Sequence, residues 1–413
     1  MLKIDIPTST SSPTWTTLET FIREQVQTCL QRVLEEEVDD LLGRGRHARR
    51  SVDTAVGHRN GFGKPRQVAL MNGTITVRRP RVRGLDARFE SRILPLFQRR
   101  TPEVAKLLPE LYLHGLSSGD FTLALRGLLG ESAPLSASSV QRLTEDWQRD
   151  YAQWRTQDLS ALVPVYVWAD GIYVKAGLES TKAALLVLIA ALADGTKVVL
   201  AVESGHRESS ESWAEILRDL TARGLPAPAC VIGDGALGLW NAVGQVWPHA
   251  AEQRCWNHKL RNVVDAVPLK HQPDVQGAVQ RIAAAESVAA AEQERQRFHR
   301  AYRLRFPKAC ERLDRDWARM LTYYQFPKEH WRHLRTTNVV ESPFAAVRLR
   351  TSAAKRFKKV ERATAIIWRL LRVAEKRFRK LNAPEQCRDV YRGVRYADGL
   401  EVPAVSSTQK AAA

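Results

Sequence analysis

The chain has 413 residues, 44% hydrophobic and 26% charged, a balance that excludes a disordered protein and predicts more than one folded domain. Its 63 lysines and arginines outnumber its 45 aspartates and glutamates, and the formal charge of +18 indicates a polyanionic partner, most commonly nucleic acid. No apolar run reaches membrane-spanning length and the five cysteines are widely scattered, so we expect a reduced, cytoplasmic protein without a disulfide framework.

Residues 15–150 combine a long helix with a basic hairpin. A Ser-, Thr- and Pro-rich stretch over residues 1–14 is expected to be disordered, and apolar residues at helical spacing then predict a helix over Trp15–Leu42 that ends at Gly43. Val68–Val77 predicts two strands joined by Asn72-Gly73, a strong hairpin signal. The basic run that follows supplies four candidate DNA contacts: Arg78, Arg79, Arg81 and Arg83.

Three short helices are predicted between residues 101 and 154. They begin at Thr101-Pro102, at Ser117 or Ser118, and within Ser136–Ser139. Helices separated by short polar turns are typical of a helix-turn-helix module, whose third helix reads a DNA groove. A plain three-helix bundle explains the pattern equally well, and the neighbouring basic hairpin favours DNA binding only modestly.

Residues 155–265 change to an α/β pattern. Short apolar runs, a turn at Asp194-Gly195 and a capped amphipathic segment predict four strands and a helix after the third strand. The predicted strands are 163–169, 183–192, 197–203 and 229–233. By fold-level analogy this order is that of a ribonuclease-H-like core, in which the first and fourth strands lie side by side.

Two aspartates follow the first and fourth predicted strands, each beside a glycine. A carboxylate at the end of a buried strand needs a positive partner, and divalent metal ions prefer oxygen ligands. Asp170 and Asp234, with the later Glu341, are therefore our candidate catalytic and metal-binding residues. Taken alone, each aspartate is more often a simple turn residue.

Glu341 could have a structural role instead of a catalytic one, because Asn338 and Glu341 match a capping box at the start of a helix. Pro343 would then lie too deep in the helix and remove a backbone hydrogen bond. A helix that begins at Ser342, with Pro343 in its first turn, is easier and leaves Glu341 at the helix entrance.

A long helical segment separates the second aspartate from the glutamate. The gap is 107 positions, against 64 between the aspartates, which predicts a helical insertion domain over residues 266–335. The rest of the core, 336–382, is expected to hold Glu341 and a basic helix over about Glu361–Leu381, followed by a C-terminal tail over 383–413.

The basic residues are clustered near the C-terminus. Charge that served only solubility would be scattered over the chain. Residues 344–381 contain 13 lysines and arginines and two acids. The candidate DNA contacts here are Arg348, Arg350, Lys355 and Arg356.

Cys255 and His258 have the spacing of half a zinc site. The remaining ligands would have to be remote histidines (His271, His330 or His333), and no second cysteine pair exists. The sequence favours a packing or hydrogen-bonding pair near the active site, with Arg254, Lys259 and Arg261 steering DNA.

Seven motifs in order resemble the DDE transposases of the Mutator type, which bacterial insertion sequences carry. They are RNGFGKPR (59–66), RRPRVRG (78–84), LYLHGLSSGDF (111–121), ADGIYVKAG (169–177), GDGALGLWNAV (233–243), QRCWNHKLRN (253–262) and RTTNVVES (335–342). After the final Glu-Ser this chain has PFAAVRLRT, where many members carry an Asn-containing basic stretch.

The resemblance implies a multidomain α/β enzyme with a ribonuclease-H-like core, an all-helical insertion and a preceding DNA-binding region. Asp170, Asp234 and Glu341 would hold two Mg²⁺ ions, with Mn²⁺ as a substitute, for DNA cleavage and strand transfer. The implied partners are duplex DNA, as terminal inverted repeats and as target, and further copies of the chain in a homodimer or higher oligomer. The implied location is the bacterial nucleoid.

Two other functions remain compatible with the sequence. One is a non-catalytic DNA-binding protein derived from a transposase, although its drift would be expected to erase the carboxylates first. The other is a structure-selective nuclease with the same core fold, which would not need so extensive an N-terminal DNA-binding region.

Overall fold

The computed structural model describes residues 13–48, 57–116, 118–130, 137–177, 182–205 and 208–403. The chain divides into two compact units, Met1–Leu143 and Thr144–Ala413, and the division falls within one helix, α4 (Ala137–Trp154). Most of the tail predicted over residues 1–14 lies outside the described residues.

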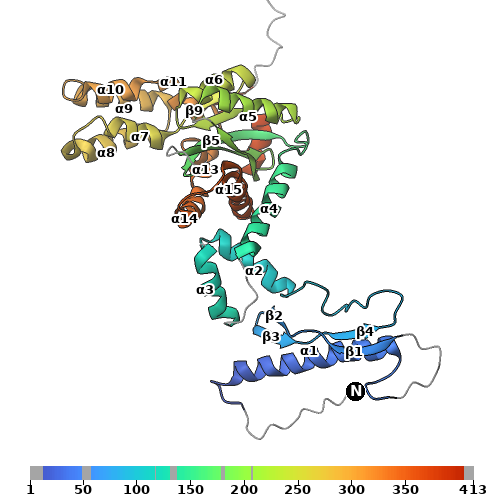
Figure 1. Cartoon of the computed structure of the whole chain (residues 1–413). Coiled ribbons are helices and arrows are strands. Elements are labelled where there is room, and N and C mark those ends of the chain that lie inside the picture. Colours follow the sequence, from blue (N-terminus) through green and yellow to red (C-terminus); the bar gives the residue numbers. More distant parts are fainter. Residues whose placement is uncertain are drawn as a thin grey trace, which may run out of the picture. The chain divides into compact units, whose positions relative to one another are not determined.

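The first unit is built on a long helix and two pairs of strands (Figure 1). Its elements are α1 (Leu18–Leu42), β1 (His58–Phe62), β2 (Arg66–Leu70), β3 (Gly73–Val77), β4 (Pro80–Arg83), α2 (Pro102–Leu113), α3 (Ser118–Leu129) and the start of α4. The predicted first helix and its C-cap are confirmed, because Gly43 adopts the left-handed conformation that glycine reaches without strain. The core that joins α1 to the strands consists of Leu34, Val68, Ile75, Val77 and Leu94.

β2 and β3 form the predicted hairpin. Leu70 pairs with Gly73, which leaves Met71 and Asn72 as the two-residue turn, one position earlier than expected. The basic run after the hairpin does not extend it, because β4 pairs antiparallel with β1. The first unit thus presents two separate antiparallel pairs.

α2, α3 and α4 confirm the three predicted helices. From Thr144 onward, however, α4 belongs to the second unit. There Tyr151 and Trp154 pack against Trp368, with ring centroids 5.8 and 5.6 Å apart. This half of the candidate groove-reading helix is therefore held by protein packing and is not free to enter a DNA groove.

A five-stranded mixed sheet forms the centre of the second unit. Its strands are β5 (Pro164–Val174), β6 (Ala183–Leu192), β7 (Lys197–Gly205), β8 (Cys230–Gly233) and β9 (Ala251–Arg254). Their order is β7-β6-β5-β8-β9, with β5, β6 and β7 antiparallel in sequence and β8 parallel to β5 and β9. The four predicted strands, the Asp194-Gly195 hairpin and the pairing of the first strand with the fourth are confirmed, and β9 is an addition.

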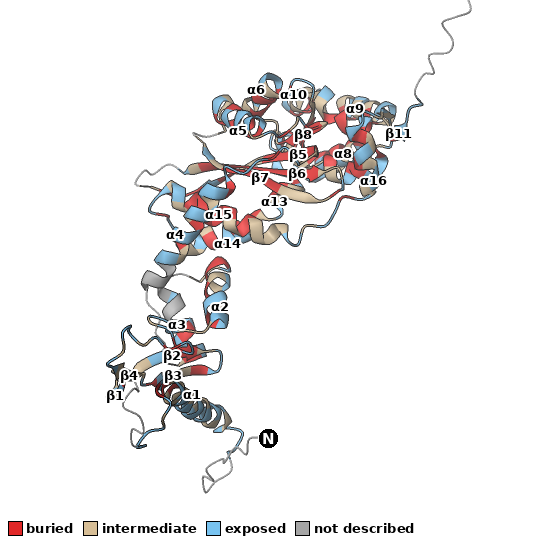
Figure 2. Cartoon of the chain, turned by 90° about the vertical axis from the view of Figure 1, so that its right-hand side faces the viewer, coloured by how far each residue is buried: buried red, intermediate tan, exposed pale blue. Residues whose placement is uncertain are grey.

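Helices cover both faces of this sheet (Figures 1 and 2). On one face α5 (Ser210–Ala222) and α6 (Leu237–Val246) bury Trp213, Leu217 and Trp240 against alternate residues of the strands, such as Val167 and Leu188. On the other face lie α13 (Asn338–Glu341), which contacts β5 and β6, and α15 (Val360–Glu375), which contacts β7.

After β9, the segment that leads to the glutamate is mostly helical, as predicted for residues 266–335. It contains α7 (Trp256–Val264), α8 (Gln272–Ala283), α9 (Val288–Tyr302), α10 (Pro307–Asp314), α11 (Trp317–Met320), α12 (Trp331–Leu334) and 3₁₀ turns at Leu269–His271, Thr322–Gln325 and Lys328–His330. The helices α7 to α10 pack on one another. None of the helices in the described part of the chain is long and apolar enough to cross a membrane.

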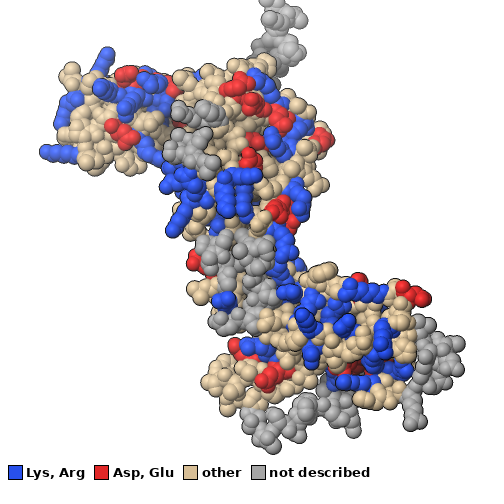
Figure 3. Space-filling model, in the orientation of Figure 1, with Lys and Arg blue, Asp and Glu red and all other residues tan. Residues whose placement is uncertain are grey.

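The C-terminal part holds α14 (Phe344–Ala354), α15, α16 (Pro384–Tyr391) and a small strand pair, β10 (Tyr396–Ala397) with β11 (Leu400–Glu401). The predicted basic helix is confirmed in α15, although it ends six residues earlier than expected. The segment predicted only as a tail contains α16, whose Cys387 and Val390 are buried. Figure 3 shows lysine and arginine side chains gathered over α14 and α15.

Candidate active site

The register between β5 and β8 brings the two candidate aspartates together. Trp168 pairs with Ile232 in these parallel strands, and continuing the register by two residues sets Asp170 beside Asp234. Residues two apart on a strand point to the same face, so both aspartates lie on the face opposite α5 and α6. That face is the one covered by α13, which ends at Glu341.

The prediction that Asp170 ends a strand is wrong. β5 continues to Val174, and Asp170 pairs with Val187 in the middle of the β5–β6 ladder. The strand continues because Ile172 and Val174 are buried and β6 is long enough to pair with them. Asp234, in contrast, directly follows the end of β8, as predicted.

Each aspartate is oriented by a local backbone hydrogen bond. Gly171 N–H donates to Asp170 Oδ1 and Ala236 N–H donates to Asp234 Oδ1, each at 2.8 Å. Burial raises the pKa of Asp170 to about 7, and the charges of Glu341 and Asp234 add to this rise, while the Gly171 bond and His258 oppose it. The aspartates, the glutamate and the histidine thus share one electrostatic site.

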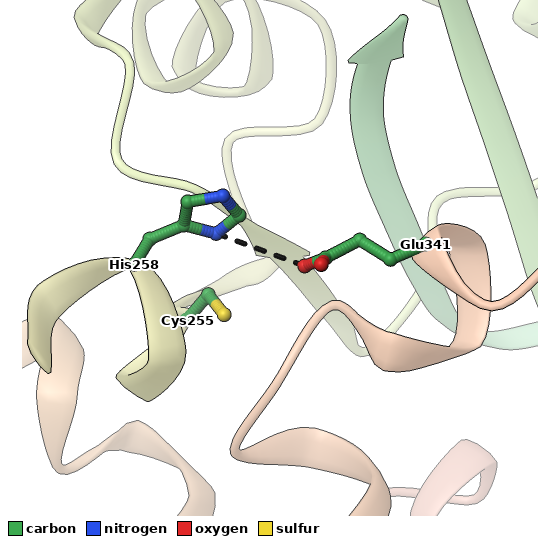
Figure 4. Close-up of side chains that lie close together, drawn as sticks. All are labelled: Cys255, His258 and Glu341. Carbon is green, nitrogen blue, oxygen red and sulfur yellow. Dashed lines mark ion pairs between the residues drawn. The ribbon is translucent and has the colours of Figure 1, made fainter. Parts of the chain in front are cut away.

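Glu341 is held by the residue just before its helix. The Thr337 hydroxyl donates to Glu341 Oε1, and His258 Nδ1 lies 3.8 Å from the same oxygen (Figure 4). The capping box does not form, because Asn338 Oδ1 instead accepts from the Asn257 amide at 3.1 Å. The next helix, α14, begins at Phe344, so Glu341 does lie near a helix entrance.

Cys255 and His258 belong to this site as well. Cys255 Sγ accepts from Thr337 N–H at 3.3 Å and lies 3.2 Å from Thr337 Oγ1. A hydrogen bond with Cys255 raises the pKa of His258 to about 9 against the effect of burial. Burial opposes ionisation of the thiol, but its bonds to His258 and Thr337 outweigh burial and lower the pKa of Cys255.

Glu341 completes a group of three possible metal-binding residues with Cys255 and His258. In the described part of the chain, these three are the group whose candidate metal-ligand atoms all lie within 4.8 Å of one another. The remote histidines do not join them, and His330 Nδ1 instead lies 2.8 Å from the Tyr166 hydroxyl. Cys255 and His258 take part in hydrogen bonds beside Glu341, as one of the two interpretations of the pair predicts.

Glu208 is a further acidic residue that the sequence did not single out. It is hydrogen-bonded to Tyr173, and burial followed by the charge of Asp234 raises its pKa. A Cβ at Gly171 would collide with the Glu208 carboxylate, so the glycine leaves room for this side chain beside Asp170. No spacing signal pointed to it, since it lies in the loop between β7 and α5.

Three of the predicted DNA contacts are interior residues. Lys259 is fully buried and donates from Nζ to the carbonyl oxygens of Arg312 and Arg315, and burial lowers its pKa to about 7. Arg254 is buried against Asp316, and Arg350 is 2% exposed. Their buried side chains are not available to contact DNA.

Arg254 has a structural task at the site. Its Nη1 pairs with Asp316 Oδ2 at 2.6 Å, and its Nε donates to the Asp234 carbonyl at 3.3 Å. It therefore ties the turn that carries Asp234 to the start of α11.

Replacing Arg254 with alanine is expected to lower the free energy of unfolding by about 2 kcal/mol, because Asp316 loses its buried ion pair and keeps only the pair with Arg319, whose Nη1 lies 3.2 Å from Asp316 Oδ1. Urea denaturation checks this value. The matched control is the exposed Arg261→Ala, which should stay within about 0.5 kcal/mol of the wild type. Equal stability of the two variants would contradict the assigned role.

Comparison with known sequences adds independent information. The family model described as Transposase, Mutator family, matches residues 3–380. The transposase for insertion sequence element IS6120 of Mycolicibacterium smegmatis is 45% identical over 281 residues, which cover 68% of this chain and 87% of that protein. The transposase for insertion sequence element IST2 of Acidithiobacillus ferrooxidans is 40% identical over 279 residues, which cover 67% and 94%.

Similarity extends to more distant proteins. The transposase for insertion sequence element IS256 in transposon Tn4001 of Staphylococcus aureus is 27% identical over 317 residues, which cover 76% of this chain and 80% of that protein. Both the family match and these alignments cover the greater part of the chain.

Proposed function

Because this chain belongs to the Mutator family of transposases, we propose that it binds the terminal inverted repeats of an insertion sequence and there cuts and joins DNA strands by a Mg²⁺-dependent DDE mechanism. The observation that carries the proposal is the convergence of three carboxylates on one face of the sheet. Asp170 and Asp234 come from adjacent strands and Glu341 from the helix packed over them.

We further propose that the second unit contains a ribonuclease-H-like catalytic core. Support comes from the strand order β7-β6-β5-β8-β9, in which β6 alone runs antiparallel to the others. It comes also from the position of α5 between β7 and β8 in the chain. The helices within residues 266–335 would be its insertion.

The donor set suits Mg²⁺. One oxygen of each carboxylate accepts a hydrogen bond from the chain, so Asp170, Asp234 and Glu341 are oriented and each retains a second oxygen for a metal ion. Two bound Mg²⁺ ions, or Mn²⁺ in their place, would activate the attacking water or DNA 3′-OH and stabilise the leaving oxygen. The chain itself aims the carboxylates, and His258, whose pKa is raised to about 9, brings a positive charge 3.8 Å from Glu341 Oε1.

The surface of the chain supplies exposed cations for the proposed duplex DNA partner. They are Arg78, Arg81 and Arg83 in the first unit and Arg261, Arg348, Lys355 and Arg356 in the second. Because strand transfer joins two ends to a target, we propose that at least a homodimer acts on DNA, at the bacterial nucleoid.

Replacing Thr337 with valine is expected to reduce strand cleavage about tenfold with little change in DNA binding, because the isosteric side chain no longer donates to Glu341. Thr337→Ser keeps the donor and is expected to retain most of the activity. Cleavage rates on an end-bearing duplex measure the difference. Equal rates for the valine and serine variants would show that this hydrogen bond does not position Glu341.

The test of the proposed function uses the purified full chain, Mg²⁺, a labelled duplex bearing the element's ends and a scrambled duplex. A transposase cuts at the ends and joins them to a target. A structure-selective nuclease would cut without preference for the ends and without joining. A non-catalytic descendant would bind the ends and never cut with any divalent metal.

A further inference from the structure

A cationic cavity lies in the first unit, far in sequence from the carboxylates. Its volume is about 490 Å³, and β1, β2, β4 and the loops next to them line it. Its cationic lining residues are Lys64, Arg66, Arg79, Arg81 and Arg88, and none of the described residues that line it carries a carboxylate. We call this cavity the arginine pocket. Figure 3 shows lysine and arginine side chains gathered over this part of the first unit.

The cations of the arginine pocket form no ion pair within the described part of the chain, although Arg88 also borders a second hollow lined by Glu37, Asp40, Asp86 and Glu90. Elsewhere in the same unit Arg59 pairs with Asp39 and Arg46 with Glu35. No such ion pair between described residues involves a cation of the pocket. The chain thus neutralises other arginines of this unit and leaves these crowded together.

Two arginines of the pocket, Arg66 and Arg79, are in surroundings that destabilise their charged or hydrogen-bonding groups. Burial, and then the charges of Arg79 and Arg99, lower the pKa of Arg66. The Nε of Arg79 is buried and has no hydrogen-bond partner among the described residues. A buried donor without an acceptor is destabilising, so an anion that enters the pocket gains both charge and hydrogen-bond compensation.

We propose that the arginine pocket binds backbone phosphates of duplex DNA. This proposal rests on the proposed function. The guanidinium fork matches phosphate oxygens in two parallel hydrogen bonds. Five cations exceed the single charge of one phosphodiester, whereas consecutive phosphates along a strand supply several. Phosphate contacts fix the position of a protein on DNA without reading its sequence. The pocket therefore anchors any duplex, and discrimination of the element's ends lies elsewhere.

The test measures binding of the full chain to an end-bearing duplex and to a scrambled duplex over a series of KCl concentrations. Arg79→Gln and Arg81→Gln are expected to weaken binding to both duplexes equally, by about tenfold, and to reduce the salt slope by about 1 each. Arg79→Lys should keep most of the slope, because the charge remains. The control Lys106→Gln removes an exposed cation of the same unit outside the pocket and should match the wild type.

The outcomes separate the pocket from the function. If the wild type binds and cuts the ends while both glutamine variants behave like Lys106→Gln, the pocket assignment is overturned and the function stands. If the variants lose affinity only for the end-bearing duplex, the pocket reads bases and the backbone assignment is overturned. If the wild type never cuts but the variants show a reduced salt slope of binding to both duplexes, phosphate binding by the pocket is supported and the transposase function is contradicted. Arg81 is exposed, so its variant tests the pocket even if Arg79→Gln does not fold.

Discussion

Asp170→Asn is expected to reduce strand cleavage by about 10³-fold or more while DNA binding stays near that of the wild type. Asparagine has nearly the same shape, but it lacks the charge with which Asp170, together with Asp234 and Glu341, would hold metal ions. Cleavage of an end-bearing duplex and binding to it, measured on the same preparation, check both parts. The exposed Asp265→Asn serves as the matched control and should behave like the wild type. Cleavage by Asp170→Asn within tenfold of the wild type would remove Asp170 from the centre.

Without metal, the free energy of unfolding of Asp170→Asn is expected to depend on pH differently from that of the wild type. Burial raises the pKa of Asp170 from 3.8 to about 7, so between these values the unfolded chain is ionised there and the folded chain is not. The contribution of Asp170 to stability is therefore present at low pH and lost as pH rises to about 7. In EDTA, the free energy of unfolding of Asp170→Asn should rise relative to the wild type over this interval. A constant difference would contradict the buried, crowded position of the carboxylate.

Removal of divalent metal is expected to have the other large effect. EDTA should abolish cleavage and joining, and Mg²⁺ or Mn²⁺ should restore both. The reason is that three carboxylates on one face repel the phosphates of DNA unless cations neutralise them. Binding through the basic surfaces should persist in EDTA, because those contacts use lysine and arginine. Cleavage that continues undiminished after exhaustive chelation would exclude the proposed mechanism.

The sheet could be predicted from the sequence because its strands are short apolar runs with distinct turns between them. Asp194-Gly195 marked the β6–β7 turn, and the β-branched runs marked β5 and β8. The continuation of β5 beyond Asp170 could not be predicted, because an aspartate and a glycine normally interrupt a strand. Only pairing with β6 and the burial of Ile172 and Val174 override that local signal.

The candidate triad could be named from its residues, but its surroundings could not. Thr337 and Cys255 are 82 positions apart, and no pattern in either segment predicts that the Cys255 thiol contacts Thr337 beside Glu341. Lys259 had the appearance of a surface cation, yet its partners are backbone carbonyls of Arg312 and Arg315. Whether a charged residue is buried depends on such distant acceptors, and composition does not contain that information.

The most direct test of the account is the number of metal ions that the three carboxylates hold together. Mn²⁺ uptake, followed by electron paramagnetic resonance of the free ion, would be titrated for the full chain bound to an end-bearing duplex. The wild type should take up two ions per active site, and Asp170→Asn, Asp234→Asn and Glu341→Gln should each lose uptake. Unchanged uptake in all three variants would contradict a shared metal centre at these residues.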